Sequence, residues 1–241
     1  MNTAIDRSGV FVASQLGYVK NPESSPGFGP AITVSRQTGS GAHEIAERVA
    51  NLLHEIDPGD PREWNVFDRQ LVEKALEEHK LPTRLAKYMP EDRRTYVDDV
   101  MDELFGLHPP SWVLVPQMVE TVMHLLKNGH VIIVGRGAVA ASARMPGIFH
   151  VRLVASLPKR IGRIQARLGL NAEQAGKYVR RSDRGAHRFA HVYFHASIED
   201  DLLYHLVINT DRIPYDNAAG LIAREAREYF KREAILSGAS R

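Results

Sequence analysis

The segment Thr38-Gly39-Ser40-Gly41 joins a short β-branched run to a helical pattern, and its residue types suit the binding of an anion. A glycine turn that opens a helix directs backbone N–H groups and the positive end of the helix dipole at one point. We therefore expect phosphate oxygens to contact this turn and its flanks, which are Arg36, Thr38, Gly39, Ser40, Gly41, Ala42 and His43.

The side chains that usually complete such a loop are missing. The regular form ends in Gly-Lys-Ser/Thr, with the lysine on the β- and γ-phosphates and the hydroxyl on Mg²⁺, whereas this chain reads Gly41-Ala42-His43. Arg36 and His43 are candidates for the missing positive charge, because guanidinium and imidazolium groups donate to phosphate oxygens. The alternatives are a purely structural glycine turn and a solvated histidine at the start of a helix.

Two more strand-like runs end in charged residues. Asp68-Arg69 follow the run 64–67, and Arg136 follows the apolar run 131–134. Ligands gather at the carboxyl edge of an open parallel sheet. Asp68 there would hold Mg²⁺ through water, or it would cap the helix that follows. An arginine between two glycines can bring its planar guanidinium close to a phosphate, so Arg136 is a candidate for binding an acceptor.

A cationic stretch runs from 159 to 188, with nine lysines and arginines against the acids Glu173 and Asp183. On a helix over 172–190, one face is apolar (Ala175, Val179, Ala186, Phe189) and the opposite face is basic (Lys177, Arg181, Arg184, Arg188). A basic face is usually a solvated surface. However, solvated faces normally mix charges of both signs, and this one is nearly all positive.

Three histidines, His187, His191 and His195, follow at intervals of four along the expected continuation of that helix. A zinc site would need a further ligand and a defined outer shell, so we favour a surface or packing role and predict no metal site in the protein itself. The absence of cysteine excludes disulfides and thiolate chemistry.

Strand and helix patterns alternate along the chain. Strands are expected at 31–35, 64–67, 131–134, 149–154 and 204–208, and helices at 42–56, 70–79, 111–127, 158–168, 172–190 and 217–230. Such alternation predicts an α/β fold with a parallel sheet and crossover helices. The stretch 81–107 has the pattern of an inserted helical pair. Residues 1–30, which end in a Pro/Gly/Ser-rich run, are expected to form an arm or linker.

Bulk composition bounds the class of protein. The chain has 241 residues, 44% of them hydrophobic, and a net charge of +2, which fits one large domain over 31–236 and argues against polyanion binding by overall charge. No apolar run approaches the roughly 18 residues of a membrane helix, and the N-terminus lacks the order of a secretory signal. We expect a cytoplasmic protein without membrane contact.

The order and spacing of four motifs resemble the cytidylate kinase-like family of bacterial proteins. The motifs are the loop region 32–46, Phe67-Asp68-Arg69, the run 132–138 and Leu206–Thr210, and the resemblance spans about 31–230. In that family the loop commonly lacks its lysine, and an arginine usually stands where this chain has His43. The resemblance implies a P-loop NTPase-like parallel sheet flanked by helices, with a helical acceptor insertion and a helical lid over 158–195.

The resemblance also assigns expected roles to side chains. Lid arginines of such kinases stabilise the transferring phosphoryl group. In the lid, the resemblance includes Arg160, Arg163 and Asp183. With Asp68, and with Arg181 and Arg188 from the basic helix face, these are the expected catalytic residues, and Arg69 and Arg136 would bind the acceptor. Two departures matter. Ala186 stands where the family commonly has an arginine, so Arg184 or Arg188 would have to substitute, and Gly137 replaces the acidic residue after the acceptor-binding arginine. Selectivity for cytosine is therefore not implied.

Three functions compete on this evidence. The leading hypothesis is a nucleotide-dependent phosphotransferase that uses Mg²⁺ with ATP or another nucleoside triphosphate and a small acceptor, such as a nucleoside monophosphate. The second is a catalytically impaired nucleotide-binding sensor or partner-binding module, supported by the missing loop lysine and hydroxyl. Nucleic-acid binding by the basic helices is the weakest, because aromatic residues for base stacking are scarce there. The acceptor, the oligomeric state and the purpose of residues 1–30 are left open.

Overall fold

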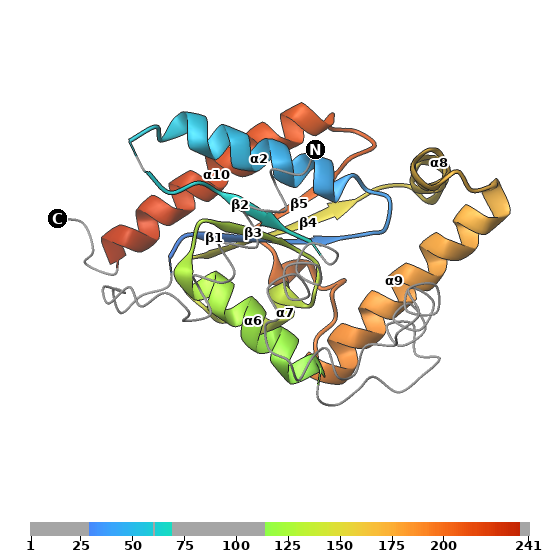
Figure 1. Cartoon of the computed structure of the whole chain (residues 1–241), viewed down its shortest axis with the longest axis horizontal. Helices are drawn as coiled ribbons and strands as arrows, with labels where there is room; N and C mark the ends of the chain where they lie inside the picture. The colour runs from blue at the N-terminus through green and yellow to red at the C-terminus, as the bar shows by residue number, and fades with distance from the viewer. Residues whose placement is uncertain (1–28, 60, 69–113, 237–241) are drawn as a thin grey trace, which may run out of the picture.

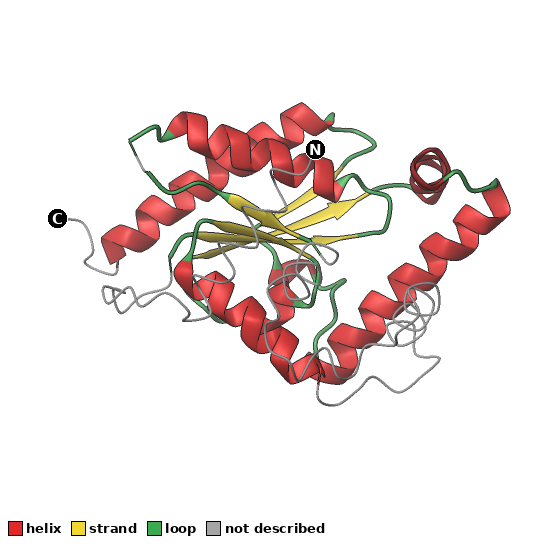
Figure 2. Cartoon of the chain, in the orientation of Figure 1, coloured by secondary structure: helices red, strands yellow, loops and turns green. Residues whose placement is uncertain are grey.

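A computed structural model of the protein describes residues 29–59, 61–68 and 114–236. Within these ranges the chain forms a five-stranded, all-parallel sheet in the order β2-β3-β1-β4-β5. The strands are β1 (Ala31–Arg36), β2 (Asn65–Phe67), β3 (Val131–Val134), β4 (Ile148–Val154) and β5 (Leu206–Asn209). The predicted α/β fold, a parallel sheet flanked by helices, is confirmed (Figures 1 and 2).

Helices connect the strands. They are α2 (Ala42–Ile56), α6 (Leu114–Asn128), the short α7 (Ala138–Ser142), α8 (Leu157–Leu168), α9 (Ala172–Phe194), the 3₁₀ turn η2 (Asp201–Leu203) and α10 (Tyr215–Leu236). No helix among the described residues is both long enough and apolar enough to cross a membrane. The helix expected at 70–79, the pair expected at 81–107 and nearly all of the arm expected at 1–30 lie outside the described residues.

Several element boundaries differ from the sequence expectations, each for a local reason. The strand expected to begin at Tyr204 begins at Leu206, because the Asp200 side chain accepts the Leu202 N–H and folds the preceding residues into η2. Helix α9 continues four residues past Ala190. It ends where His195 adopts a left-handed conformation with φ 51°. The capping box expected at the start of α9 is present.

One face of the sheet is a continuous apolar core. Helices α2 and α10 cover it, as Figure 1 shows above the sheet. The side chains that fill this layer are aliphatic and fully or nearly fully buried, and they include Ile32, Val34, Val151, Leu153 and Ile222. Strand β1 pairs with β3 on one side and β4 on the other, so its apolar run is buried as expected for a central parallel strand.

The opposite face of the sheet is divided. Its upstream part packs against α6 and α7 through apolar residues such as Ala31, Ile133 and Ile148. Its downstream part, toward the carboxyl ends of β1 and β4, is polar although buried: Thr33, Ser35, His150 and Arg152 are each at most 6% exposed. The pairing places Thr33 beside His150 and Ser35 beside Arg152.

Helices α8 and α9 extend beyond the carboxyl edge of the sheet, where Figure 1 shows them joined as a separate pair. They have a small core of their own, with Ile164, Ala175 and Val179 at most 1% exposed. Of the apolar stripe expected on α9, Ala175 and Val179 are buried, and Ala186 and Phe189 are partly buried. The pair is therefore held together independently of the main core.

Candidate functional site

The glycine turn between β1 and α2 is a tight loop that lies against α8. Gly39 and Gly41 have φ of 85° and 86°, and the Ser40 N–H donates to the Gln37 carbonyl at 3.1 Å. A Cβ on Gly39 would lie 2.7 Å from the Arg160 carbonyl oxygen. Both the backbone conformation and the close approach of α8 therefore require glycine at position 39.

The start of α2 presents backbone donors at this loop. The first intrahelical bond runs from the Ile45 N–H to the Gly41 carbonyl at 3.0 Å, so the N–H groups of the preceding turn have no acceptor within the helix. The Ser40 hydroxyl is buried and has no hydrogen-bond partner among the described residues. This end of the helix carries the positive end of its dipole, and the loop has the geometry of an anion site.

Arg163 of α8 joins the loop to the end of β5. Its Nη1 donates to the Gly39 carbonyl at 3.2 Å and to Thr210 Oγ1 at 3.0 Å, and its Nη2 donates to the Thr210 carbonyl at 3.0 Å. The Thr210 hydroxyl in turn donates to the Ser40 carbonyl at 3.0 Å. The carbonyls of Gly39 and Ser40 thus accept hydrogen bonds from α8 and from the residue that follows β5.

Helix α9 is bound to the same loop through Asp183. This carboxylate accepts the Thr38 N–H at 2.8 Å and Arg160 Nη1 at 2.6 Å, and Arg160 also donates to the Thr38 carbonyl at 3.2 Å. The Thr38 hydroxyl donates to the Ser182 hydroxyl at 2.7 Å. Because the Arg160 side chain is only 8% exposed, removing either ion of this pair would leave an uncompensated, largely buried charge.

The structure brings Asp68 and His43 together at the carboxyl edge of the sheet. His43 Nδ1 lies 3.4 Å from Asp68 Oδ2, with the two side chains 51% and 29% exposed. Sequence reasoning assigned these residues to separate functions. They meet because the end of β2 and the start of α2 lie at the same edge.

Arg136 lies at the same edge, on the turn that follows β3. Gly135, Arg136 and Gly137 all have left-handed backbones, with φ of 80°, 61° and 65°. A Cβ on Gly135 would lie 2.9 Å from the Arg36 guanidinium carbon, and one on Gly137 would lie 2.6 Å from the Phe194 ring. The turn therefore packs between β1 and the end of α9. Arg69 lies outside the described residues.

Arg181 and Arg188 of α9 differ from Arg160, Arg163 and Asp183 in their burial and position. Arg181 is half-buried, and Arg188 is exposed and, with His191, lines a cavity of about 480 Å³. Of the three histidines considered as a metal face, His187 instead pairs with Glu199 at 3.3 Å. The described residues contain no group of three or more histidines and acids that could hold a metal ion.

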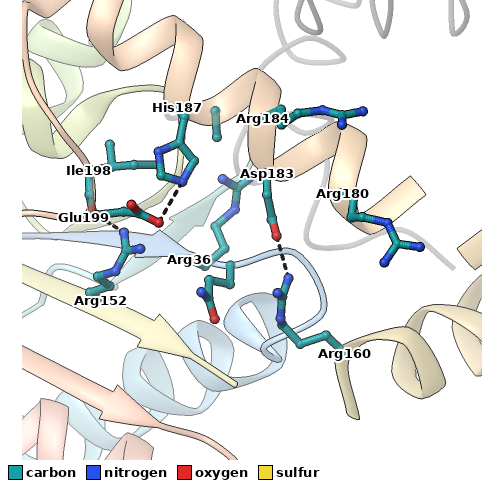
Figure 3. A pocket seen from close by; sticks show the side chains of 11 residues that line it. Arg36, Arg152, Arg160, Arg180, Asp183, Arg184, His187, Ile198 and Glu199 are labelled. Atoms are coloured by element: carbon teal, nitrogen blue, oxygen red, sulfur yellow. Dashed lines mark hydrogen bonds and ion pairs between the residues drawn. The ribbon is translucent and has the colours of Figure 1, made fainter. Parts of the chain in front are cut away.

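A strongly cationic cavity of about 350 Å³ lies between the carboxyl ends of β1 and β4 and helix α9 (Figure 3). Five arginines line it (Arg36, Arg152, Arg160, Arg180, Arg184) together with two carboxylates (Asp183, Glu199). Sequence reasoning missed Arg152 and Glu199 as site residues. One signal was present: His150 and Arg152 are polar residues at alternate positions of a strand expected to be buried.

Comparisons with known proteins are consistent with this geometry. The model of the cytidylate kinase-like family matches residues 31–212. A curated relative, a uronate isomerase from Corynebacterium glutamicum, is 27% identical over 114 residues, which cover 47% of this chain but only 22% of the relative. The chain thus matches about a fifth of that protein's length.

A solved structure shares the fold at low sequence identity. An uncharacterised protein from Eubacterium ventriosum has a TM-score of 0.56 and 15% identity, and the match covers 82% of this chain and 98% of that one. A protein from Thermus thermophilus has a TM-score of 0.46 and 19% identity, with 83% and 97% covered. Because the family model matches most of the chain, including the glycine loop and both helices docked on it, this protein belongs to the cytidylate kinase-like family.

Proposed function

We propose that the protein is a nucleotide-dependent phosphotransferase that moves a phosphoryl group from ATP or another nucleoside triphosphate to a small acceptor. The main support is the set of hydrogen bonds that dock α8 and α9 on the glycine loop through Arg160, Arg163 and Asp183. A solvated basic surface would not need to be tied to a phosphate loop in this way.

The loop and its arginines would share the work of the absent lysine. Backbone N–H groups of the loop and of the first turn of α2 would hold the β- and γ-phosphates. Arg160 and Arg163 already lie against the loop, so their fixed charges would stabilise the negative charge that spreads over the transferring group. Catalysis would then rest on positioning and electrostatics, with no covalent step on the protein.

Mg²⁺ is the expected partner of the triphosphate, and Asp68 fits a role in holding it. This carboxylate is partly exposed, at the strand edge beside the start of α2. Mg²⁺ keeps several waters and needs few protein carboxylates when substrate phosphates are present. When bound, the ion would neutralise phosphate charge, and Asp68 would orient its water shell. His43 would compete for the same carboxylate.

A matched pair of variants on α8 tests the proposal. Arg163→Ala removes the guanidinium that bonds the loop, whereas Arg167→Ala removes an exposed guanidinium one turn further along the same helix. We expect the first to lower phosphoryl transfer from labelled ATP to a panel of nucleoside monophosphates and sugars by about 10²-fold, the size of losing one preorganised donor. The second should change it less than about twofold.

Two readouts separate the alternatives. Calorimetry with ATP and Mg²⁺ reports binding at the loop, and the transfer assay reports turnover. Binding of ATP without transfer to any acceptor of the panel would favour the nucleotide-binding module instead. No binding of any nucleoside triphosphate would overturn the phosphate-loop assignment itself. Arg163→Lys, which keeps the positive charge, is the control that distinguishes loss of the charge from a folding defect.

A further inference from the structure

Arg152 is a buried charge with an unusual set of partners. The residue is 4% exposed and lies on the polar face of β4, beside Ser35 of β1. Its Nη1 donates to the Ile198 carbonyl and lies near the hydroxyls of Tyr204 and Ser35, at 3.4 and 3.5 Å. Its guanidinium carbon lies 5.6 Å from the centre of the Tyr204 ring. All of these partners are neutral.

No carboxylate of the described ranges pairs with Arg152. A buried guanidinium is expected to be paired with an anion, because taking an isolated charge out of water is very unfavourable. The two carboxylates that line the same cavity are engaged elsewhere: Asp183 with Arg160 and Thr38, and Glu199 with His187. The Arg152 charge thus faces a cavity whose acids already have partners.

In the remaining lining, arginines outnumber carboxylates. Figure 3 shows Arg36 and Arg152 approaching the same space from β1 and β4, whereas Arg180 and Arg184 extend from α9 with their guanidinium groups turned away. Ala186 and Ile198 are the apolar members of the described lining, which contains no phenylalanine, tyrosine or tryptophan ring, and its one imidazole, that of His187, is paired with Glu199. The volume of about 350 Å³ fits a compact ligand.

We propose that this cavity binds the anionic group of the acceptor, a phosphate or carboxylate, with Arg152 as its deepest contact, and that it recognises this group without reading a nucleobase. That the bound anion belongs to the acceptor rests on the proposed phosphotransferase function, whereas the anion site itself does not depend on that function. Arg36 would provide the second guanidinium, and Arg184 on α9 would close over the ligand from the rim.

Calorimetry in the absence of nucleoside triphosphate tests the ligand class on the full-length protein. The probes are ribose 5-phosphate, cytidine 5′-monophosphate, uncharged cytidine and glucuronate. We expect ribose 5-phosphate and cytidine monophosphate to bind within about threefold of each other, and cytidine to bind at least about tenfold more weakly, because the charged group carries the recognition. The stronger of ribose 5-phosphate and glucuronate identifies phosphate or carboxylate as the preferred anion.

Two results would overturn the proposal at this stage. One is a preference of more than about tenfold for cytidine monophosphate over ribose 5-phosphate, which would show that the base is read. The other is the absence of millimolar binding by any of the anionic probes.

Variants then locate the site. Arg152→Gln should weaken the anionic probe at least about tenfold and leave ATP binding at the loop unchanged, because it removes a charge-assisted contact. Tyr204→Phe is the control for a merely structural role: it disturbs the same 198–204 segment, where the Tyr204 hydroxyl donates to the Ile198 carbonyl at 2.7 Å, but it retains the charge. If the affinity for the anionic probe falls equally in both variants, the role of Arg152 is only to hold the 198–204 segment in place.

A rim variant keeps the test valid if Arg152→Gln does not fold. Arg184→Glu reverses an exposed charge of the cavity lining and should weaken the anionic probe, whereas Arg167→Glu, which lies outside the lining, should not. If anion binding depends on these residues but no phosphoryl transfer occurs, the proposed function is refuted and the cavity is still an anion site. If anion binding is unaltered in both Arg152→Gln and Arg184→Glu, the cavity is not the anion site, and the proposed function is unaffected.

Discussion

Strands β1 and β4 present two different faces along the same paired residues. On the side of α2 and α10, alternate positions are aliphatic, as in Val34 and Leu153. On the other side, the intervening positions near the carboxyl end are polar, as in Ser35 and Arg152. Because side chains alternate between the faces of a strand, a single pair of strands provides both a stable core and a buried polar surface for chemistry.

The comparison indicates a division of energetic roles between the two faces. Burial of aliphatic side chains is the dominant favourable term in folding, and it is supplied on the α2 and α10 side. The polar row gains little from burial and needs hydrogen bonds to remain folded, such as the one between Thr33 Oγ1 and His150 Nδ1 at 2.6 Å. Such a local loss of stabilising apolar burial is expected at functional sites.

The largest predicted effect tests the apolar face. Leu153→Ala should lower the free energy of unfolding by about 3 kcal/mol, because it opens a cavity in a fully buried layer. Ser35→Ala, on the opposite face of the neighbouring strand, should lower it by less than about 1 kcal/mol. Urea unfolding measures both. Equal losses would contradict the division between the faces.

The second prediction concerns pH and the polar face. Burial, with a smaller contribution from the charge of His205, lowers the pKa of His150 to about 4. Burial also lowers the pKa of His205. The unfolded chain therefore binds more protons between about pH 6.5 and pH 4, so stability is fully present above pH 6.5 and falls as the pH drops.

The expected size follows from the pKa of His150. Between pH 7 and pH 5, His150 should account for a loss of about 2 kcal/mol in the free energy of unfolding. In His150→Gln, urea unfolding at the two pH values should show a difference smaller by about that amount, whereas His54→Gln, at an exposed position of α2, should behave as the wild type. A variant with undiminished pH dependence would show that His150 does not titrate as a buried group.

Local sequence patterns carried most of the fold. The continuous apolar run of β3 and the capping box at Asn171 predicted elements that the structure contains. The glycine loop was also recognisable, because its glycines are dictated by a conformation local to the turn, and its role in binding phosphate stays a prediction. Arg160, Arg163 and Asp183 were identified by resemblance, and the structure places them against the loop while their catalytic roles stay predictions.

The cavity around Arg152 could not be predicted from the sequence of a single strand. Its lining requires the register of β4 on β1 and the return of the segment after α9 beneath β4, which brings Ile198 and Glu199 to Arg152. Neither the pairing nor the path of a connecting segment follows from residue types alone. Because the sequence does not show that His187 pairs with Glu199, His187 also resembled a metal ligand.

The smallest predicted effect on stability separates the docked arginines from the exposed one on α9. Arg188→Ala should change the melting temperature no more than Arg224→Ala on α10, since both side chains are exposed and surface charges contribute about 0–1 kcal/mol.

The two variants should differ in turnover if α8 and α9 close as a lid, because closure would bring the basic face of α9 over the phosphates. Arg188→Ala should then lower phosphoryl transfer severalfold, whereas Arg224→Ala leaves it unchanged. Hydrogen exchange should show nucleotide-dependent protection at the ends of α8 and α9, with the cluster around Ile164 and Val179 protected in both states. If exchange and turnover are both unaltered, Arg188 belongs to an ordinary solvated surface, and phosphate contacts on this side are limited to the arginines already docked on the loop.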